Sequence, residues 1–249
     1  MKIKDNETIA IIPARSGSKG IKDKNIVDVC GFPLIAYSVM AAHMCREISR
    51  ILVSTDSEEY ADIARQYRAE VPFLRPKKFS GSKAQDIEYL SHALYYLKNM
   101  ENYVPEFIVL LRPTTPIRDV SIIERAIASL KKNRSASALV SVHYAQECPY
   151  KWMKIGSNGY LESPFQGMKP DDVNMPRQSF ERLLVPNGYV DVLKSQTILG
   201  EKCVYGETAI PFLIQQEVVD IDITADLKKI ECSEIGELEI YKRLLQTCQ

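Results

Sequence analysis

The chain has 249 residues, with 32 lysines plus arginines balanced by 32 aspartates plus glutamates, so its formal net charge at pH 7 is zero. Apolar residues make up 45% and charged residues 26%, as in soluble globular chains, which excludes a disordered chain. The lack of an overall basic field argues against nucleic acid or a membrane surface as a partner. We therefore expect one principal domain over residues 1–249, in which a local cluster of cations holds any anionic ligand.

We expect neither export nor membrane insertion from this sequence. Its first apolar run is too short for a signal peptide, and no stretch approaches the ~20 apolar residues of a membrane-spanning helix. The six cysteines are scattered, without CxxC pairs or histidines at metal-binding spacing. We expect a cytoplasmic protein whose cysteines are thiols in a reducing compartment.

Short β-branched runs alternate with longer segments whose apolar residues recur at helical spacing. The expected strands are Thr8–Ile12, Arg50–Ser54, Phe107–Leu111 and Ala138–Val142. The expected helices are Pro33–Glu47, Glu58–Arg68, Gln85–Asn99 and Val120–Lys132. This alternation predicts an α/β fold with a doubly wound, mostly parallel sheet. Ligands of such sheets bind beyond the carboxyl ends of the strands, which places residues 14–25, 55–56 and 112–118 at one rim.

The alternation stops after about residue 143. Residues 144–181 are rich in Pro, Gly, Asp and Asn, which predicts an inserted arm. Strand patterns return in Gly188–Leu193 and Gln216–Ile223, and a final amphipathic helix is expected from Ala225 to about Leu245.

The loop after the first strand is the strongest local signal. The segment Ile11–Asn25 reads IIPARSGSKGIKDKN and combines two glycines and two serines with Arg15 and three lysines. Such a loop can direct backbone N–H groups and cationic side chains at phosphates. It matches neither the GxGxxG motif nor the GxxxxGK[ST] motif, so the two usual nucleotide-binding readings are excluded.

Two carboxylates near the carboxyl terminus have metal-binding spacing. Asp220 and Asp222 are two residues apart on an expected strand, so both should project from one face with Cα atoms roughly 7 Å apart. That arrangement suits a shared hard cation. Capping of the following helix is the alternative, although Thr224 and Asp226 fit that role better.

Several motifs in one order resemble the acylneuraminate cytidylyltransferases, also called CMP-sialic acid synthetases. The loop Pro13–Asn25 almost completely matches the family's opening signature, PAR-x-G-S-K-G-x-x-x-K-N. The later motifs are VSTDSEE at 53–59, LRP at 74–76, RPTTPIR at 112–118, PRQ at 176–178, PNG at 186–188 and DID at 220–222. The resemblance spans nearly the whole chain and implies a nucleotide-diphospho-sugar transferase-like fold with an inserted dimerisation arm.

The resemblance also implies a reaction, in which CMP passes from CTP to the anomeric hydroxyl of a nine-carbon acidic sugar and pyrophosphate is released. It places Arg15, Lys19 and Lys24 around the CTP phosphates, as a triphosphate of about four negative charges requires. It places Asn25 and Arg75 near the cytosine and ribose.

The metal and the assembly follow from the same resemblance. Asp220 and Asp222 are implied to bind Mg²⁺, with Asp222 counted among the catalytic residues. Lys151 and Arg177 match positions that reach from the arm of one subunit into the active site of the other, which implies a homodimer. Asn187, in the PNG motif, is a further expected substrate-binding residue.

The chain departs from the family pattern at four positions. Arg112 replaces a common glutamine, and Asp86 stands where a Ser or Thr is expected near the ribose. Val185 replaces a residue that is often basic, and Tyr189 a small alanine. We expect Asp86 and Arg112 to bind substrate, with the planar fork of Arg112 holding the sugar carboxylate. A bracing salt bridge to a neighbour such as Asp119 is the alternative.

Two other functions remain open from the sequence. One is a cytidylyltransferase for a shorter acidic sugar such as Kdo, although those enzymes usually carry Arg-Leu-Pro and Lys-Pro where this loop has Lys19-Gly20-Ile21 and Lys24-Asn25. The other is a nucleotide-binding protein without turnover. The identity of the sugar, whether N-acetylneuraminate, legionaminate, pseudaminate or another nine-carbon acid, also stays open.

Overall fold

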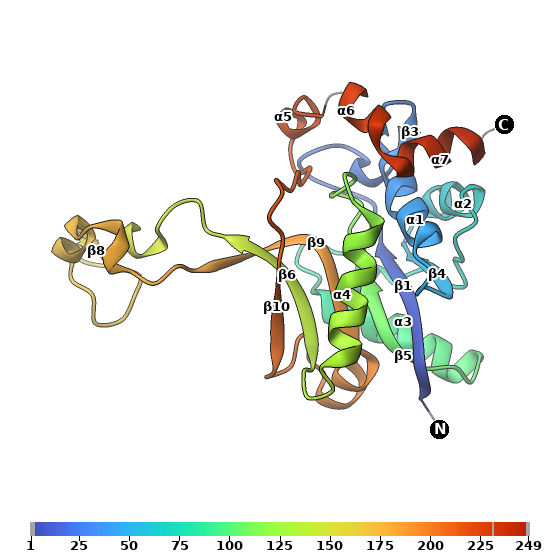
Figure 1. Ribbon diagram of the computed structural model, residues 1–249, viewed down its shortest axis with the longest axis horizontal. Coiled ribbons are helices and arrows are strands. Elements are labelled where there is room, and N and C mark those ends of the chain that lie inside the picture. The colour runs from blue at the N-terminus through green and yellow to red at the C-terminus, as the bar shows by residue number, and fades with distance from the viewer. Residues whose placement is uncertain (1–2, 231, 248–249) are drawn as a thin grey trace.

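A six-stranded sheet forms the centre of the computed structural model, which describes residues 3–230 and 232–247 (Figure 1). The strand order is β10-β6-β9-β5-β1-β4. These strands are β1 (Lys4–Pro13), β4 (Arg50–Ser54), β5 (Pro105–Leu110), β6 (Ala138–Tyr144), β9 (Leu184–Lys194) and β10 (Ala209–Leu213). Because β9 runs antiparallel to both β5 and β6 while the other neighbouring pairs are parallel, the sheet is mostly parallel, as predicted.

Helices cover both faces of the sheet, which confirms the doubly wound architecture. Side chains of β1 alternate between the faces: Ala10 and Ile12 pack into one apolar cluster, and Ile9 and Ile11 into the other. The first cluster contains side chains of α1 (Leu34–Met44), α2 (Glu58–Gln66), α4 (Val120–Lys132) and α7 (Glu239–Thr247). The second contains α3 (Asp86–Met100).

Local sequence signals explain where these helices begin. The Ser57 hydroxyl accepts a hydrogen bond from the Tyr60 N–H at the start of α2, and the Asp119 carboxylate accepts one from the Ser121 N–H at the start of α4. The starts of α2, α3 and α4 all follow the carboxyl ends of strands or the loops beyond them. Each helix therefore returns the chain across a face of the sheet.

The predicted strand Gln216–Ile223 is wrong. The sixth strand is β10, which precedes that segment and carries Pro211 at an edge of the sheet, where proline is tolerated. The chain beyond it crosses the carboxyl ends of the strands, with single backbone bonds from Ile214 to Val142 and from Ile221 to Thr114. No neighbouring strand runs beside it among the described residues, so its apolar alternation cannot form a ladder.

The predicted continuous helix Ala225–Leu245 is also wrong. The structure has three shorter helices there: α5 (Thr224–Leu227), α6 (Cys232–Glu237) and α7. Asp226 ends the preceding loop by accepting the N–H groups of Asp222 and Ile223 at 3.0 Å each. Gly236, a poor helix former, lies just before the bend at Leu238 that separates α6 from α7.

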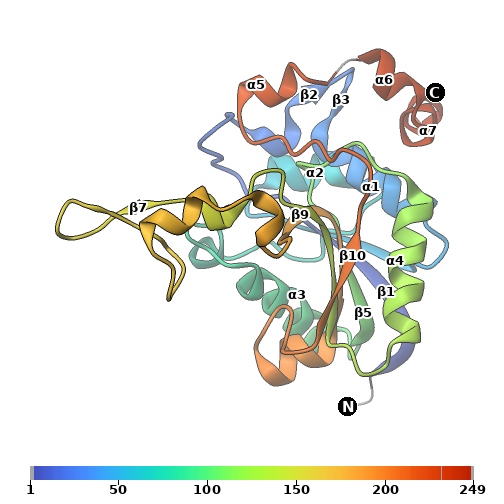
Figure 2. The same cartoon turned by 60° about the vertical axis from the view of Figure 1, so that its left-hand side comes forward.

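Residues between β6 and β9 leave the body of the molecule as a long projection, visible in both views (Figures 1 and 2). We call residues 145–183 the arm. It contains the short hairpin β7 (Lys154–Ile155) and β8 (Leu161–Glu162), and a small aromatic cluster in which the Tyr150 ring lies 4.7 Å from Phe165 and 5.3 Å from Phe180. A short hairpin precedes α1, formed by the two-residue strands β2 (Asp28–Val29) and β3 (Phe32–Pro33).

Within residues 3–230 and 232–247, no helix is long and apolar enough to cross a membrane. Cys45, Cys148 and Cys203 are free thiols, in line with the sequence-based expectation. Cys30 is disulfide-bonded, which differs from the expectation that the cysteines are thiols.

Candidate active site

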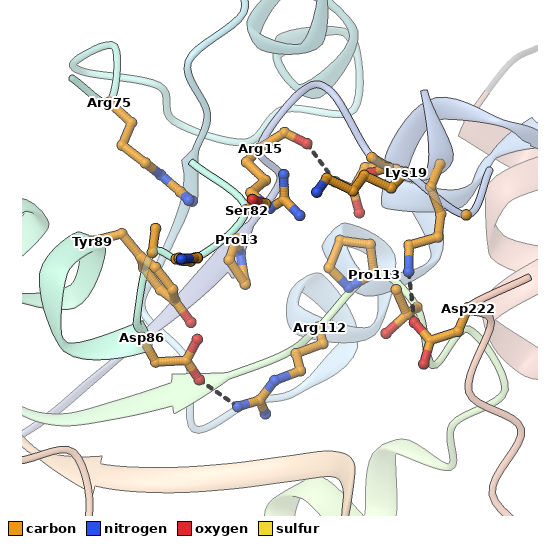
Figure 3. A pocket seen from close by; sticks show the side chains of 17 residues that line it. Pro13, Arg15, Lys19, Arg75, Ser82, Asp86, Tyr89, Arg112, Pro113 and Asp222 are labelled. Atoms are coloured by element: carbon orange, nitrogen blue, oxygen red, sulfur yellow. Dashed lines mark hydrogen bonds and ion pairs between the residues drawn. The ribbon is translucent and has the colours of Figure 1, made fainter. Parts of the chain in front are cut away.

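A cavity of about 610 Å³ opens at the carboxyl ends of β1 and β5 (Figure 3). Its wall comes from the loop after β1, the segment before α3, the turn after β5 and the chain preceding α5. Residues singled out from the sequence that line it are Arg15, Lys19, Lys24, Asn25, Arg75, Asp86, Arg112 and Asp222. The topology therefore gathers into one space residues that are up to 207 positions apart in the chain, from 15 to 222.

The loop after β1 is held in place by side-chain hydrogen bonds. The Asp56 carboxylate, just after β4, accepts hydrogen bonds from the Ser16 N–H at 2.7 Å and the Ser16 hydroxyl at 2.9 Å. The buried Asn25 amide donates to the Arg15 carbonyl at 2.9 Å. Gly17 turns the loop with φ +68°, a conformation that favours glycine. These contacts leave Arg15 and Lys19 directed at the cavity (Figure 3).

The loop and the chain before α5 touch at one glycine. A Cβ atom at Gly20 would overlap the carbonyl oxygen of Asp222, so only glycine allows the two backbones to approach this closely. The same approach brings Lys24 Nζ to 2.7 Å from Asp222 Oδ1. Lys24 is mostly buried, whereas 71% of the Asp222 side chain is exposed to the cavity and solvent. The pair therefore places a cation and a carboxylate side by side at the cavity wall.

Gly20→Ala tests this contact. We expect the variant to bind CTP, the ligand that the sequence resemblance implies, about tenfold more weakly and to melt at a lower temperature, because overpacking costs about 1–3 kcal/mol and pushes the loop away from Asp222. Calorimetric titration with CTP and a thermal melt measure both effects. Gly200→Ala is the matched control, since a Cβ there meets nothing within 4 Å. Unchanged CTP affinity in Gly20→Ala would show that the close approach does not shape the cavity.

Arg75 and Tyr89 form the opposite wall from Lys19 and Asp222 (Figure 3). Arg75 is buried, with its guanidinium carbon 4.5 Å from the centre of the Tyr89 ring. Its Nε and Nη2 atoms donate to the Ser54 hydroxyl and carbonyl. Burial lowers the pKa of Arg75 to about 10, so it remains a cation at neutral pH. This wall combines an aromatic face with a fixed positive charge.

Arg112 reaches the cavity from the end of β5 but is already paired. Its Nη1 atom lies 2.8 Å from Asp191 Oδ2 and its Nη2 atom 2.6 Å from Asp86 Oδ2. Burial alone would lower the pKa of Arg112, but the negative charges of Asp191 and its neighbours outweigh burial and raise it. We expected the guanidinium of Arg112 to be free to bind the sugar carboxylate. In the structure, both of its terminal nitrogens are instead bonded to carboxylates of the protein. Asp119 is not the bracing partner, since it caps α4 instead.

Asp220 lies outside the cavity wall that Asp222 forms. The pair does not sit on a strand, so the strand-based argument for a common face fails, although the two carboxylates remain close enough to interact. Loss of hydration raises the pKa of Asp220, a hydrogen bond with the Thr114 side chain opposes this, and the charge of Asp222 adds to the rise. The residue as a whole is nevertheless exposed at the rim beside Thr114, so only part of the hydration of its carboxylate is lost.

The remaining predicted residues do not line the cavity. Lys151 and Arg177 are exposed on the arm, where Arg177 Nη2 donates to the Ala145 carbonyl at 3.3 Å. Asn187 is buried at the start of the arm's return strand, and its side-chain oxygen accepts from the Tyr189 N–H at 3.2 Å. Within one chain, the structure does not bring these three residues to the cavity lining.

Two of the departures from the family pattern, Val185 and Tyr189, also lie outside the cavity lining. Val185 pairs with His143 at the base of the arm. Tyr189 is fully buried, and its hydroxyl accepts hydrogen bonds from the Asp119 N–H and from Gln216. Tyr189 therefore ties β9 to α4 and to the segment after β10.

Sequence reasoning gave no role to three residues that organise the site. Arg118 is 2% exposed and donates to the carbonyls of Arg112 and Tyr189 and to the Ser38 hydroxyl, and burial lowers its pKa to about 9. Asp191 anchors Arg112, and Asp56 anchors the loop. A charged residue inside the apolar run YVDVLK was the available signal for Asp191.

Comparison with known proteins gives matches over most of the chain. The family described as Cytidylyltransferase matches residues 9–239. N-acylneuraminate cytidylyltransferase of Escherichia coli is 30% identical over 232 residues, which cover 88% of this chain and 50% of that protein, so the chain spans about half of that relative's length. CMP-N,N'-diacetyllegionaminic acid synthase of Legionella pneumophila is 32% identical over 222 residues, which cover 88% of this chain and 92% of that protein.

A solved structure supports the fold. CMP:2-keto-3-deoxy-manno-octonic acid synthetase complexed with CTP superposes with a TM-score of 0.68 at 13% identity, covering 93% of this chain and 100% of the other. At this low sequence identity, the similarity shows only that the two proteins share a fold. The family match covers most of the chain and leads to one conclusion: this chain belongs to the cytidylyltransferase family.

Proposed function

We propose that the protein transfers CMP from CTP to the anomeric hydroxyl of a nine-carbon acidic sugar and releases pyrophosphate. The observation that carries the proposal is the cavity itself, in which Arg15, Lys19 and Lys24 line one part and the Arg75–Tyr89 wall the other. The first part suits a polyphosphate and the second a nucleoside. The acceptor class is inferred from the names of similar proteins, which specify neuraminate, legionaminic acid and pseudaminic acid.

In this reaction the hydroxyl oxygen of the sugar attacks the α-phosphorus of CTP and forms a new P–O bond. The bond from that phosphorus to the pyrophosphate oxygen breaks, and the hydroxyl proton passes to solvent. Catalysis consists mainly of positioning and of neutralising charge on the leaving pyrophosphate. Arg15 and Lys19 provide that neutralisation, and Lys24 contributes while remaining bonded to Asp222. The three histidines, His43, His92 and His143, do not line the cavity and have no part in the step.

The carboxylates Asp220 and Asp222 fit a Mg²⁺ ion, as the resemblance implies. Mg²⁺ is usually bound through one or two carboxylates together with substrate phosphates and water. No group of three or more His, Cys, Asp or Glu side chains in the described part of the chain could hold a metal by itself, so the phosphates of CTP would complete the site. Lys24 is bonded to Asp222, and the pKa of Asp220 is raised by loss of hydration and, to a lesser extent, by the neighbouring charge of Asp222. When bound, Mg²⁺ supplies charge neutralisation at the phosphates.

We also propose that a second copy of the chain completes each site. The arm projects away from the body that carries its own cavity, and it exposes large apolar side chains. These are Trp152, Ile155, Tyr160, Leu161 and Met175. Exposed apolar groups on a projection favour an interface with another molecule. In a two-fold dimer, each arm would bring Lys151 and Arg177 to the partner's cavity, where they would meet the acidic sugar.

Pyrophosphate release from CTP and Mg²⁺ tests the proposal. The acids to compare are N-acetylneuraminate, N,N'-diacetyllegionaminate, pseudaminate and Kdo, with a reaction lacking any acid as the control. We expect release that depends on one nine-carbon acid and is slower with Kdo. The strongest release with Kdo would favour the shorter-sugar alternative. CTP binding without release from any acid would favour a nucleotide-binding protein without turnover.

A further inference from the structure

A buried carboxylate anchors the ion-pair chain that leads to the cavity. Asp191 lies in β9 between β5 and β6, opposite Leu110 on one side and Val140 on the other. Its side chain is 2% exposed, and its Oδ2 atom accepts hydrogen bonds from Arg112 at 2.8 Å and from the Tyr205 hydroxyl at 3.3 Å. The second terminal nitrogen of Arg112 holds Asp86, at 2.6 Å. The order Asp191, Arg112, Asp86 therefore runs from the centre of the sheet to the cavity wall (Figure 3 shows the outer pair).

Stability alone is a weak explanation for this chain of charges. Taking a carboxylate and a guanidinium out of water is costly, and well-packed apolar residues in place of a buried ion pair often give equal or greater stability. The buried ion pair instead fixes the orientation of the Arg112 guanidinium. Because Nη1 is bound to the buried Asp191 carboxylate, the direction of Nη2 is defined, and Nη2 binds the Asp86 carboxylate.

The surroundings of Asp86 decide what it can bind. Apart from Asp222, the other charged side chains on the cavity wall are cationic, among them Arg15, Lys19 and Arg75, so the cavity suits an anionic nucleotide. A carboxylate there would repel phosphates, and Arg112 reduces that repulsion by compensating its charge. A carboxylate held in this way is an acceptor for hydroxyl groups. Asp86 shares the cavity wall with Arg75 and Tyr89, away from Lys19 and Asp222 (Figure 3).

The neutral hydroxyl donors of a nucleoside triphosphate are those of its ribose. We propose that Asp191 and Arg112 are positioning residues that fix the Asp86 carboxylate as the acceptor for the ribose hydroxyls, so that the cavity selects ribonucleotides over nucleotides lacking those hydroxyls. The inference rests on CTP being the ligand, as in the proposed function. It gives Arg112 a task different from holding the sugar carboxylate.

The measurement is calorimetric binding of CTP and of 2′,3′-dideoxyCTP, with Mg²⁺ and without sugar. We expect the wild-type chain to bind CTP about tenfold to a hundredfold more tightly, because hydrogen bonds to a charged group are of that strength. Asp86→Ala should remove most of this ratio by weakening CTP alone. Asp191→Asn and Arg112→Gln should each reduce the ratio several-fold, although Asp191 does not line the cavity. The double variant Asp86→Ala/Asp191→Asn should give the ratio of Asp86→Ala.

Asp119→Ala is the control for loss of stability, since it removes a helix cap outside the cavity and should leave the ratio unchanged. An unchanged ratio in Asp86→Ala would overturn the proposal. The proposal would also be overturned if Asp86→Ala removed the affinity ratio while Arg112→Gln and Asp191→Asn both kept it. Asp86 would then bind the ribose without being positioned by the other two residues. If Asp191→Asn fails to fold, Arg112→Gln decides alone.

Failure of the proposed function would look different. If the chain showed the expected ratio of CTP to 2′,3′-dideoxyCTP affinity but released no pyrophosphate with any acid, this inference would be supported and the proposed reaction contradicted. If the wild-type chain turned over normally but bound CTP and 2′,3′-dideoxyCTP equally well, the reaction would be supported and this inference contradicted. A chain that binds neither nucleotide would lose both.

Discussion

Asp222→Asn is expected to lower kcat at saturating Mg²⁺ at least about a hundredfold, because loss of a metal ligand removes several kcal/mol of charge stabilisation. The fold should be unaffected, since the Asp222 side chain is 71% exposed and contributes nothing to the apolar clusters. Asp220→Asn should have a similar effect if both carboxylates hold the ion. Initial rates across a Mg²⁺ titration, with a thermal melt of each variant, measure the two quantities.

A second measurement separates metal binding from general damage. In the absence of divalent ions, Asp222→Asn should bind CTP at least as tightly as the wild-type chain, because the substitution removes a negative charge near the phosphates and frees Lys24 from its ion pair. Asp5→Asn is the matched control, with the same chemical change at an exposed position at the amino end of β1. Near wild-type kcat for Asp222→Asn at saturating Mg²⁺ would contradict the metal assignment.

Two inactive variants should restore activity when they are mixed, if the arm of one subunit completes the cavity of the other. Arg15→Ala damages the body of the site, and Arg177→Ala damages the arm. Random exchange makes half of the dimers mixed, and each mixed dimer has one site with an intact body and an intact arm. The mixture should therefore regain about a quarter of the wild-type activity.

The control for this experiment is a mixture of Arg15→Ala with Lys19→Ala. Both of these lesions lie in the same loop of the body, so every site in the mixed dimers keeps one damaged body and no activity returns. Sedimentation of each variant checks that dimers form, and exchange is verified with tagged chains. A monomer, or no recovery by Arg15→Ala with Arg177→Ala after verified exchange, would exclude a shared site.

The periodicity of the sequence determined most of the fold. The expected strand Arg50–Ser54 and helix Val120–Lys132 agree with the structure residue for residue, and the other six elements expected before residue 143 agree within a few residues at each end. Periodicity succeeds there because each run contacts the sheet or a helix along its whole length. It failed at residues 216–223 and 225–245, where the chain crosses the ends of the strands and short helices pack at a corner.

The candidate site divides in the same way. The loop from Pro13 to Asn25 could be recognised from the sequence because its glycines, serines and cations are contiguous and their order is characteristic. The tertiary structure alone decided which charges meet. Lys24 bonds to a carboxylate 198 residues away, and Arg112 bonds to Asp191, which is 79 residues away, and to Asp86, which is 26 residues away. Ion pairs over such separations depend on strand order and backbone approach, which local patterns do not contain. For this reason the sequence by itself determined most strands of the sheet and the loop after β1, whereas the edge strand β10, the direction of Arg112 and the pairing of Asp222 followed only from the fold.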